Sequence, residues 1–119
     1  MSIDPGLWLK ALREFNEEKF FECHETLEVI WLNEVNPEQK NLLQGIIHIA
    51  AAFFHYRRNN LIGYRKQIEK GSGKLKSVRV DVYAEILRTD LSEFYHNILS
   101  VEKLSSFPKI HFTASEASR

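Results

Sequence analysis

Apolar residues recur at helical spacing along most of this chain, and helix-capping residues mark where individual helices begin. The pair Asp4-Pro5 places an N-cap residue before a proline at the first helical position, which predicts a short helix to about residue 15. The pair Asn36-Pro37 repeats this device and predicts a long helix to about residue 58. These two starts are the clearest local signals in the sequence.

Further stretches show the same periodicity between and after these helices. A second helix is predicted from about residue 17 to residue 33, and Asn59 with Asn60 closes the long helix. Residues 61 to 77 are again helical in pattern, but Gly71 and Gly73 predict a bend or break, since an interior glycine costs about 1 kcal/mol relative to alanine. Short helices are predicted from residue 81 and over 90–104.

The predicted fold is therefore all-α, an up-and-down antiparallel helical bundle with about five to six helices, because short loops favour antiparallel neighbours. Residues 1–104 are expected to form a single helical-bundle domain. Residues 105–119 are expected to form a non-helical, extended C-terminal tail, in which 109–113 alternates like a strand that has no partner strand. We expect this tail to be held by the domain body or by a neighbouring molecule.

Composition narrows the function classes. Lys and Arg together number 16, as do Asp and Glu, so the chain lacks the basic excess with which proteins neutralise phosphates, and no nucleic-acid partner is expected. The longest apolar run is interrupted by His48 and His55, so no membrane span is expected. A single cysteine, Cys23, excludes an intramolecular disulfide and is expected to pack as a small apolar side chain. These features predict a cytoplasmic protein.

Polar side chains nevertheless occur within the most apolar helices. On a helical wheel of about 100 degrees per residue, His24 lies on one line with Phe20 and Leu27, with Glu28 at its edge. The long helix has one largely polar stripe, which consists of Asn41, Gln44, His48, Ala51, Ala52, His55 and Asn59. Because the two helices should lie side by side, we expect both stripes to face a shared, largely dry interior.

Three hypotheses can account for these stripes. In the first, the polar side chains form a structural hydrogen-bond network that fixes the register of the helices. In the second, His24 and Glu28, spaced i and i+4, bind a divalent metal ion with His55 or His48 as a third ligand; no cofactor is otherwise indicated. In the third, a Glu28 carboxyl whose pKa is shifted by burial, and which is paired with a histidine, performs acid/base catalysis of a hydrolase type. No nucleophile is identified, because Cys23 and Thr26 lie on other faces of the helix.

An ordered set of motifs resembles the domain-of-unknown-function 309 family over about residues 8–78. The motifs are Phe15-Asn16-x-x-x-Phe20-Phe21-Glu22-x-His24-Glu25-x-Leu27-Glu28-x-x-Trp31, then Gln44-Gly45-x-Ile47-x-x-Ala50-Ala51-x-x-x-His55, then Asn60-x-x-Gly63. The resemblance implies a compact up-and-down helical bundle with no established activity. The family often has glycine near position 18 or 19, where this chain has Glu18 and Lys19, so the resemblance leaves the first interhelical turn uncertain.

We therefore predict a pocket for a small polar ligand or an ion. The alternatives are an interaction or scaffold module whose polar cluster is structural, and a metal-dependent or acid/base enzyme. The ligand-binding candidates are His24, Glu25, Glu28, Trp31, Gln44, His48 and His55, and the metal candidates are His24, Glu28 and His55. An exposed aromatic such as Trp8 or Phe112 would leave formation of a homo-oligomer open.

Overall fold

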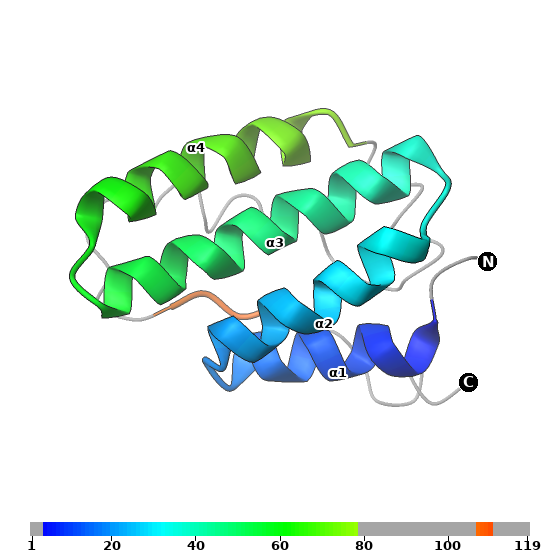
Figure 1. Cartoon of the computed structure of the whole chain (residues 1–119), viewed down its shortest axis with the longest axis horizontal. Helices are drawn as coiled ribbons and strands as arrows, with labels where there is room; N and C mark the ends of the chain where they lie inside the picture. Colours follow the sequence, from blue (N-terminus) through cyan, green and yellow to red (C-terminus); the bar gives the residue numbers. More distant parts are fainter. Residues whose placement is uncertain (1–3, 79–106, 111–119) are drawn as a thin grey trace.

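The structure, a computed structural model of the chain, describes residues 4–78 and 107–110. These residues form four helices, α1 (Pro5–Asn16), α2 (Phe20–Asn33), α3 (Pro37–Arg57) and α4 (Leu61–Lys76). Successive helices run in opposite directions, which confirms the all-α, up-and-down prediction for this part of the chain (Figure 1). The helices predicted from residue 81 and over 90–104, and the predicted boundary at 104, lie outside the described residues. The described part thus contains four helices, where the whole chain was expected to have five to six.

Side-chain caps begin three of the four helices. Asp4 Oδ1 accepts hydrogen bonds from the backbone N–H groups of Gly6 and Leu7, at 2.8 and 3.2 Å. Asn36 Oδ1 accepts from the backbone N–H groups of Glu38 and Gln39 in α3, at 3.0 and 3.1 Å. Asn60 Oδ1 accepts from Gly63 N at 3.0 Å. The starts predicted from Asp4 and Asn36 are therefore confirmed, since each cap satisfies backbone donors that the helix leaves free.

The turn between α1 and α2 departs from the prediction, which had α2 begin at about residue 17. Glu18 adopts a left-handed backbone conformation with φ 63°, so the chain reverses there and α2 begins only at Phe20. Lys19, the residue before α2, makes no side-chain capping bond. This is the turn where the family often has glycine, the residue that adopts positive φ without steric strain.

The hydrophobic core is formed by residues of α1, α2 and α3, with Leu75 added from α4. α1 packs against α2, and α4 packs against α3. α3 lies between α2 and α4 (Figure 1). Among the described helices, none is long and apolar enough to cross a membrane. The most deeply buried large side chains are Phe15, Phe53, Leu12, Leu27, Leu42, Leu43, Ile46, Ile49 and Ile110.

α4 runs without a break through its two interior glycines, contrary to the bend or break predicted there. A Cβ atom on Gly71 would lie 2.7 Å from Ile49 Cδ1 and 2.9 Å from Gly45 O, and a Cβ on Gly45 would lie 2.9 Å from Leu75. The absence of side chains at Gly45 and Gly71 lets α3 and α4 approach closely. Packing between the helices thus compensates for the low helix propensity of glycine.

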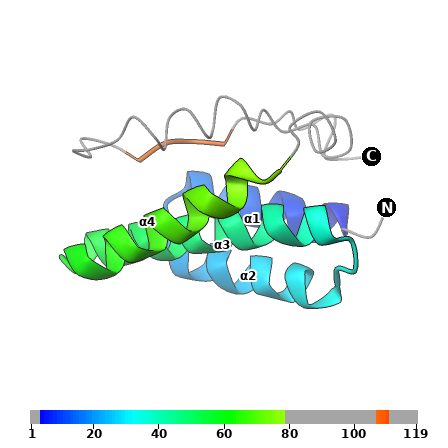
Figure 2. The same cartoon turned by 90° about the horizontal axis from the view of Figure 1, so that it is seen from above.

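Part of the predicted tail is held by the domain body, as expected. Residues 107–110 have no helical or strand structure and lie along one face of the helices, where they are drawn in orange (Figure 2). Ile110 is 1% exposed and belongs to the core cluster, and Phe107 packs against it. The hydrogen bonds of this segment join it to Asn16 at the end of α1.

Candidate functional site

A cavity of about 190 Å³ lies between the first half of α2 and the second half of α3. It is lined by Phe20, Phe21 and His24 of α2 and by Ala51, Phe54 and His55 of α3. Ala51 is the small residue at the centre of the stripe predicted on α3. The structure thus brings two of the sequence-predicted histidines, His24 and His55, from different helices to one cavity.

Aromatic rings form much of the wall of this cavity. Phe21 is roughly parallel to the His24 ring, with 6.3 Å between ring centroids and an interplanar angle of 22°. Phe54 lies 5.7 Å from Phe21 and 5.9 Å from His55. The cavity therefore has flat aromatic walls on both helices, and another planar group can stack against them.

His24 and Glu28 lie one helical turn apart on α2, as their spacing predicted. His24 Nδ1 and Glu28 Oε1 are 3.3 Å apart, within ion-pair range, but they do not form a hydrogen bond. The Nδ1 atom is itself buried, and within the described residues it has no hydrogen-bond partner. This nitrogen is thus held beside the Glu28 carboxylate and is not open to a ligand in the cavity.

The prediction of a largely dry interior around these groups is wrong. The side chain of His24 is 30% exposed and that of Glu28 is 51% exposed, and His48 and His55 are half-buried. α2 packs against both α1 and α3, so its buried face is centred on Cys23, Leu27 and Ile30, and His24 lies at the edge of that face. Because Glu28 is half exposed, the burial that the acid/base hypothesis required for its carboxyl is absent.

His55 is oriented by a neighbour in the turn to α4. Asn60 Nδ2 lies 3.4 Å from His55 Nδ1 and can donate to it, which leaves His55 Nε2 as the ring nitrogen that can contact a ligand. His48, in contrast, belongs to the interface with α4, where its Nδ1 donates to Gln67 Oε1 at 2.7 Å. The polar stripe of α3 therefore faces α2 at His55 and α4 at His48.

The remaining candidates do not line this cavity. Glu25 is exposed on the outer face of α2, and Gln44 is half-buried farther along α3. Trp31 carries Lys40 above its ring, with Nζ 3.9 Å from the centroid, and its carbonyl accepts from the same ammonium at 3.0 Å. Trp31 and Lys40 thus link the end of α2 to the start of α3.

The metal site predicted from His24, Glu28 and His55 is not formed. Among the residues that the structure describes, which include these three, no group of three or more His, Cys, Asp or Glu side chains is placed to hold a metal ion. His24 and Glu28 approach each other on α2, but of these two only His24 lines the cavity with His55. The described residues thus offer no ligand set for the divalent metal ion that the sequence suggested.

Cys23 and Thr26, which the sequence placed on other faces of α2 than His24, are both buried. Thr26 Oγ1 donates to Glu14 Oε1 at 2.7 Å and accepts from Lys10 Nζ at 3.1 Å, which ties α2 to α1. Burial, and secondarily the charge of Glu14, raises the pKa of the Cys23 thiol. Cys23 thus packs as a small apolar side chain, as predicted.

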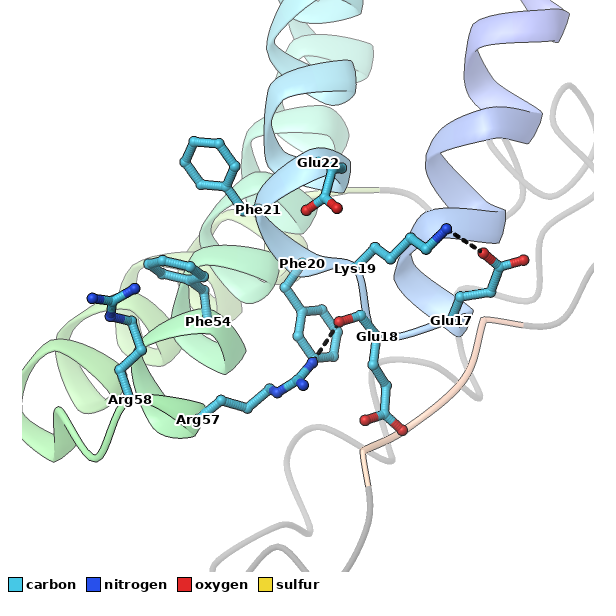
Figure 3. A pocket seen from close by; sticks show the side chains of 9 residues that line it. All are labelled: Glu17, Glu18, Lys19, Phe20, Phe21, Glu22, Phe54, Arg57 and Arg58. Carbon is cyan, nitrogen blue, oxygen red and sulfur yellow. Dashed lines mark hydrogen bonds and ion pairs between the residues drawn. The ribbon is translucent and has the colours of Figure 1, made fainter.

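A second, larger cavity of about 520 Å³ adjoins the first at the α1–α2 turn (Figure 3). The two cavities share Phe20, Phe21 and Phe54. The larger cavity is also lined by Glu17, Glu18, Lys19, Glu22, Arg57 and Arg58. Phe54, Arg57 and Arg58 are spaced i, i+3 and i+4, which places them on one face at the end of α3.

The two arginines of the larger cavity contact its other walls. Arg57 Nη1 donates to Glu18 O at 2.6 Å, and the Arg58 guanidinium lies 5.2 Å from the Phe54 ring centroid. Lys19 Nζ and Glu17 Oε1 form an ion pair at 3.3 Å. The side chains drawn in Figure 3 therefore surround the aromatic surface with both signs of charge.

The model of the family described as Domain of unknown function (DUF309) matches residues 8–67, about half of the chain. The chain belongs to the DUF309 family. It is similar to the uncharacterized protein YpuF of Bacillus subtilis (strain 168), with 35% identity over 63 residues. That alignment covers 52% of this chain and 36% of YpuF, so the chain matches about a third of the length of this relative. No solved structure matches.

The DUF309 match includes most of α1, all of α2 and α3 and the first part of α4, and therefore every residue that lines the two cavities. It ends before residues 107–110. Of the motif positions inferred from the family resemblance, His24 and His55 lie at the smaller cavity, Glu28 lies beside His24, and Trp31 lies at the far end of α2. The motif is thus spread along α2 and α3, and only part of it lies at the smaller cavity.

Proposed function

We propose that the smaller cavity, between α2 and α3, binds a small ligand that has a planar apolar part and a hydrogen-bonding polar group. The observation that carries this proposal is that His24 and His55, from different helices, line one cavity whose walls also include the rings of Phe21 and Phe54. A ring nitrogen that gains a hydrogen bond to a ligand contributes about 0.5–1.5 kcal/mol of affinity.

The size and lining of the cavity suggest the class of ligand. A volume of about 190 Å³ is below the range of roughly 300–1,000 Å³ typical of sites for drug-sized molecules. A single ring fits these dimensions, and Phe21 and Phe54 offer it stacking surfaces. A longer ligand would extend into the adjoining 520 Å³ cavity, where Arg58 and Glu22 are available for polar contacts.

The proposal can be tested by NMR titration of the full chain with benzoate, benzamide and benzylamine, which have similar size and differ in charge. We expect at least one compound to give saturable shifts of the amides of Phe21, His24 and His55. His24→Ala and His55→Ala should each weaken its binding by about tenfold, the equivalent of one lost hydrogen bond.

His48→Ala is the matched control for these variants. His48 is half-buried on the same helix as His55, but its ring bonds to Gln67 of α4. Its substitution should leave the affinity within about twofold of wild type. The proposal fails if the folded wild-type chain binds none of the three compounds at about 10 mM, or if His48→Ala weakens binding as much as the other two variants do.

A protein-interaction module remains the second candidate because one observation favours it. Several large apolar residues on or after α2 are exposed, among them Leu32 at 71% and Val35 at 83%. Scattered exposed residues are common, but a contiguous apolar surface marks an interaction site. If Leu32→Ser and Val35→Ser abolish an association seen by sedimentation velocity while the small aromatic compounds do not bind, the interaction module is the better proposal.

A further inference from the structure

Phe107 inserts into an aromatic groove formed by residues far from it in sequence. Its ring centroid lies 4.9 Å from Phe20, 5.0 Å from Phe53 and 6.1 Å from Tyr56. The contacts with Phe20 and Tyr56 are edge-on, the geometry that aromatic pairs favour. Three residues later, Ile110 is almost fully buried. The segment is therefore anchored by two side chains in separate apolar positions.

The backbone of the second anchor, Ile110, is recognised by a single side chain at the end of α1. Asn16 Nδ2 donates to Ile110 O and Ile110 N donates to Asn16 Oδ1, both at 2.8 Å. The side-chain amide thus pairs with both polar groups of one residue, as a neighbouring strand would. Lys109 Nζ adds a hydrogen bond to Asn16 O at 2.6 Å and lies 3.6 Å from Glu18 Oε2.

These contacts are those by which proteins bind extended peptides: main-chain hydrogen bonds hold the backbone, and pockets for alternate side chains select the sequence. Pro108 strengthens the similarity, because its fixed φ favours an extended backbone before binding. The DUF309 match contains the groove residues Asn16, Phe20 and Phe53 but not the segment that fills the groove. The groove and its occupant are thus separate parts of the chain.

We propose that this groove is a sequence-selective peptide-binding site for the pattern Phe-Pro-x-Ile, and that residues 107–110 occupy it as a detachable intramolecular ligand. Phe107 and Ile110 supply the selectivity, and Asn16 holds the backbone. The other side chains of the segment contribute less, since Lys109 is exposed and its ion pair with Glu18 is solvated.

The first experiment vacates the groove in the full chain with the double variant Phe107→Ala/Ile110→Ala. A synthetic peptide with the sequence of residues 105–112 should bind this variant at least about tenfold more tightly than it binds wild type, whose own segment competes at high effective concentration. A peptide with both anchor residues replaced by alanine is the control and should not bind. Equal affinity for wild type and variant, or binding of the control peptide, would overturn the proposal.

A second measurement uses the wild-type chain and does not depend on the folding of any variant. The Ile110 amide is bonded to Asn16, so it exchanges with solvent only when the segment leaves the groove. A detachable segment predicts that this amide exchanges at least about 100-fold faster than the amides of Ile46 and Ile49 in α3, through local opening. Equal protection of all three amides would mean that the segment leaves only on global unfolding, and the proposal would be wrong.

Discussion

Asn16 and Ile110, 94 positions apart in the sequence, exchange two hydrogen bonds of 2.8 Å through the Asn16 side-chain amide and the Ile110 backbone. Each group satisfies the other, and Ile110 is buried, so loss of the amide would leave backbone polar groups without a partner. Asn16→Ala should therefore lower the free energy of unfolding by about 1–3 kcal/mol. Urea denaturation followed by circular dichroism measures this change.

Asn33→Ala is the matched control for this prediction. Asn33 is also at the end of a helix, but its Nδ2 donates only to Val29 O of the same exposed turn, at 2.9 Å. Its replacement should change the free energy of unfolding by less than about 0.5 kcal/mol. If both asparagine variants lose the same stability, the Ile110 contact has no special role.

Gly71 and Gly73 provide a second matched pair, this time within one helix. A Cβ on Gly71 would collide with Ile49 and with the Gly45 carbonyl, whereas a Cβ on Gly73 would have no atom of the described residues within 4 Å. Gly71→Ala should lower the free energy of unfolding by about 1–3 kcal/mol through overpacking. Gly73→Ala should raise it by about 0.5–1 kcal/mol, since alanine is the better helix former. Thermal melts of the two variants should shift in opposite directions, and two shifts of the same sign would contradict the packing argument.

The features that local sequence could predict are those that depend on neighbouring residues. Asp4 and Asn36 cap α1 and α3 as expected because a cap bonds to backbone groups two or three residues away. The continuity of α4 at Gly71 could not be predicted in this way, since it depends on Gly45 and Ile49 in another helix. Helix propensity alone favoured a break there.

The candidate site could be predicted only in part, because its contacts also depend on how separate helices pack. The periodicity placed His24 at the α2–α3 contact and grouped His48 with His55. It could not show that His48 would instead form a hydrogen bond with Gln67 of α4. The contacts of Thr26 with Glu14 and Lys10 were also missed, because they depend on α1 packing against α2. The role of Asn16 had one available signal: it is among the motif residues of the family resemblance.

The left-handed backbone conformation of Glu18 predicts that glycine at this position stabilises the fold. Its φ of 63° is costly for a residue with a side chain, by about 1–2 kcal/mol, and costs glycine little. Glu18→Gly should therefore raise the free energy of unfolding, by up to about 1 kcal/mol after the greater entropy of glycine in the unfolded chain is subtracted. Glu18→Ala, which removes the same ion pair with Lys109 and keeps the strain, should not raise it; a stabilised alanine variant would show that the side chain, and not φ, is responsible.

Cys23 should make stability depend on pH in the alkaline range. Burial raises the pKa of its thiol above the unfolded value of about 8.5, so above pH 8.5 the unfolded chain releases a proton that the folded chain retains. The contribution of Cys23 is thus fully present below pH 8.5 and is lost as the pH rises, by about 1.4 kcal/mol per pH unit. Urea unfolding of wild type and Cys23→Ala between pH 7.5 and about 10 isolates this slope, since Tyr64, whose pKa burial also raises, titrates identically in both proteins. The difference in free energy of unfolding between the two proteins should change across this range; a constant difference would mean that the thiol ionises as readily in the folded chain as in the unfolded one.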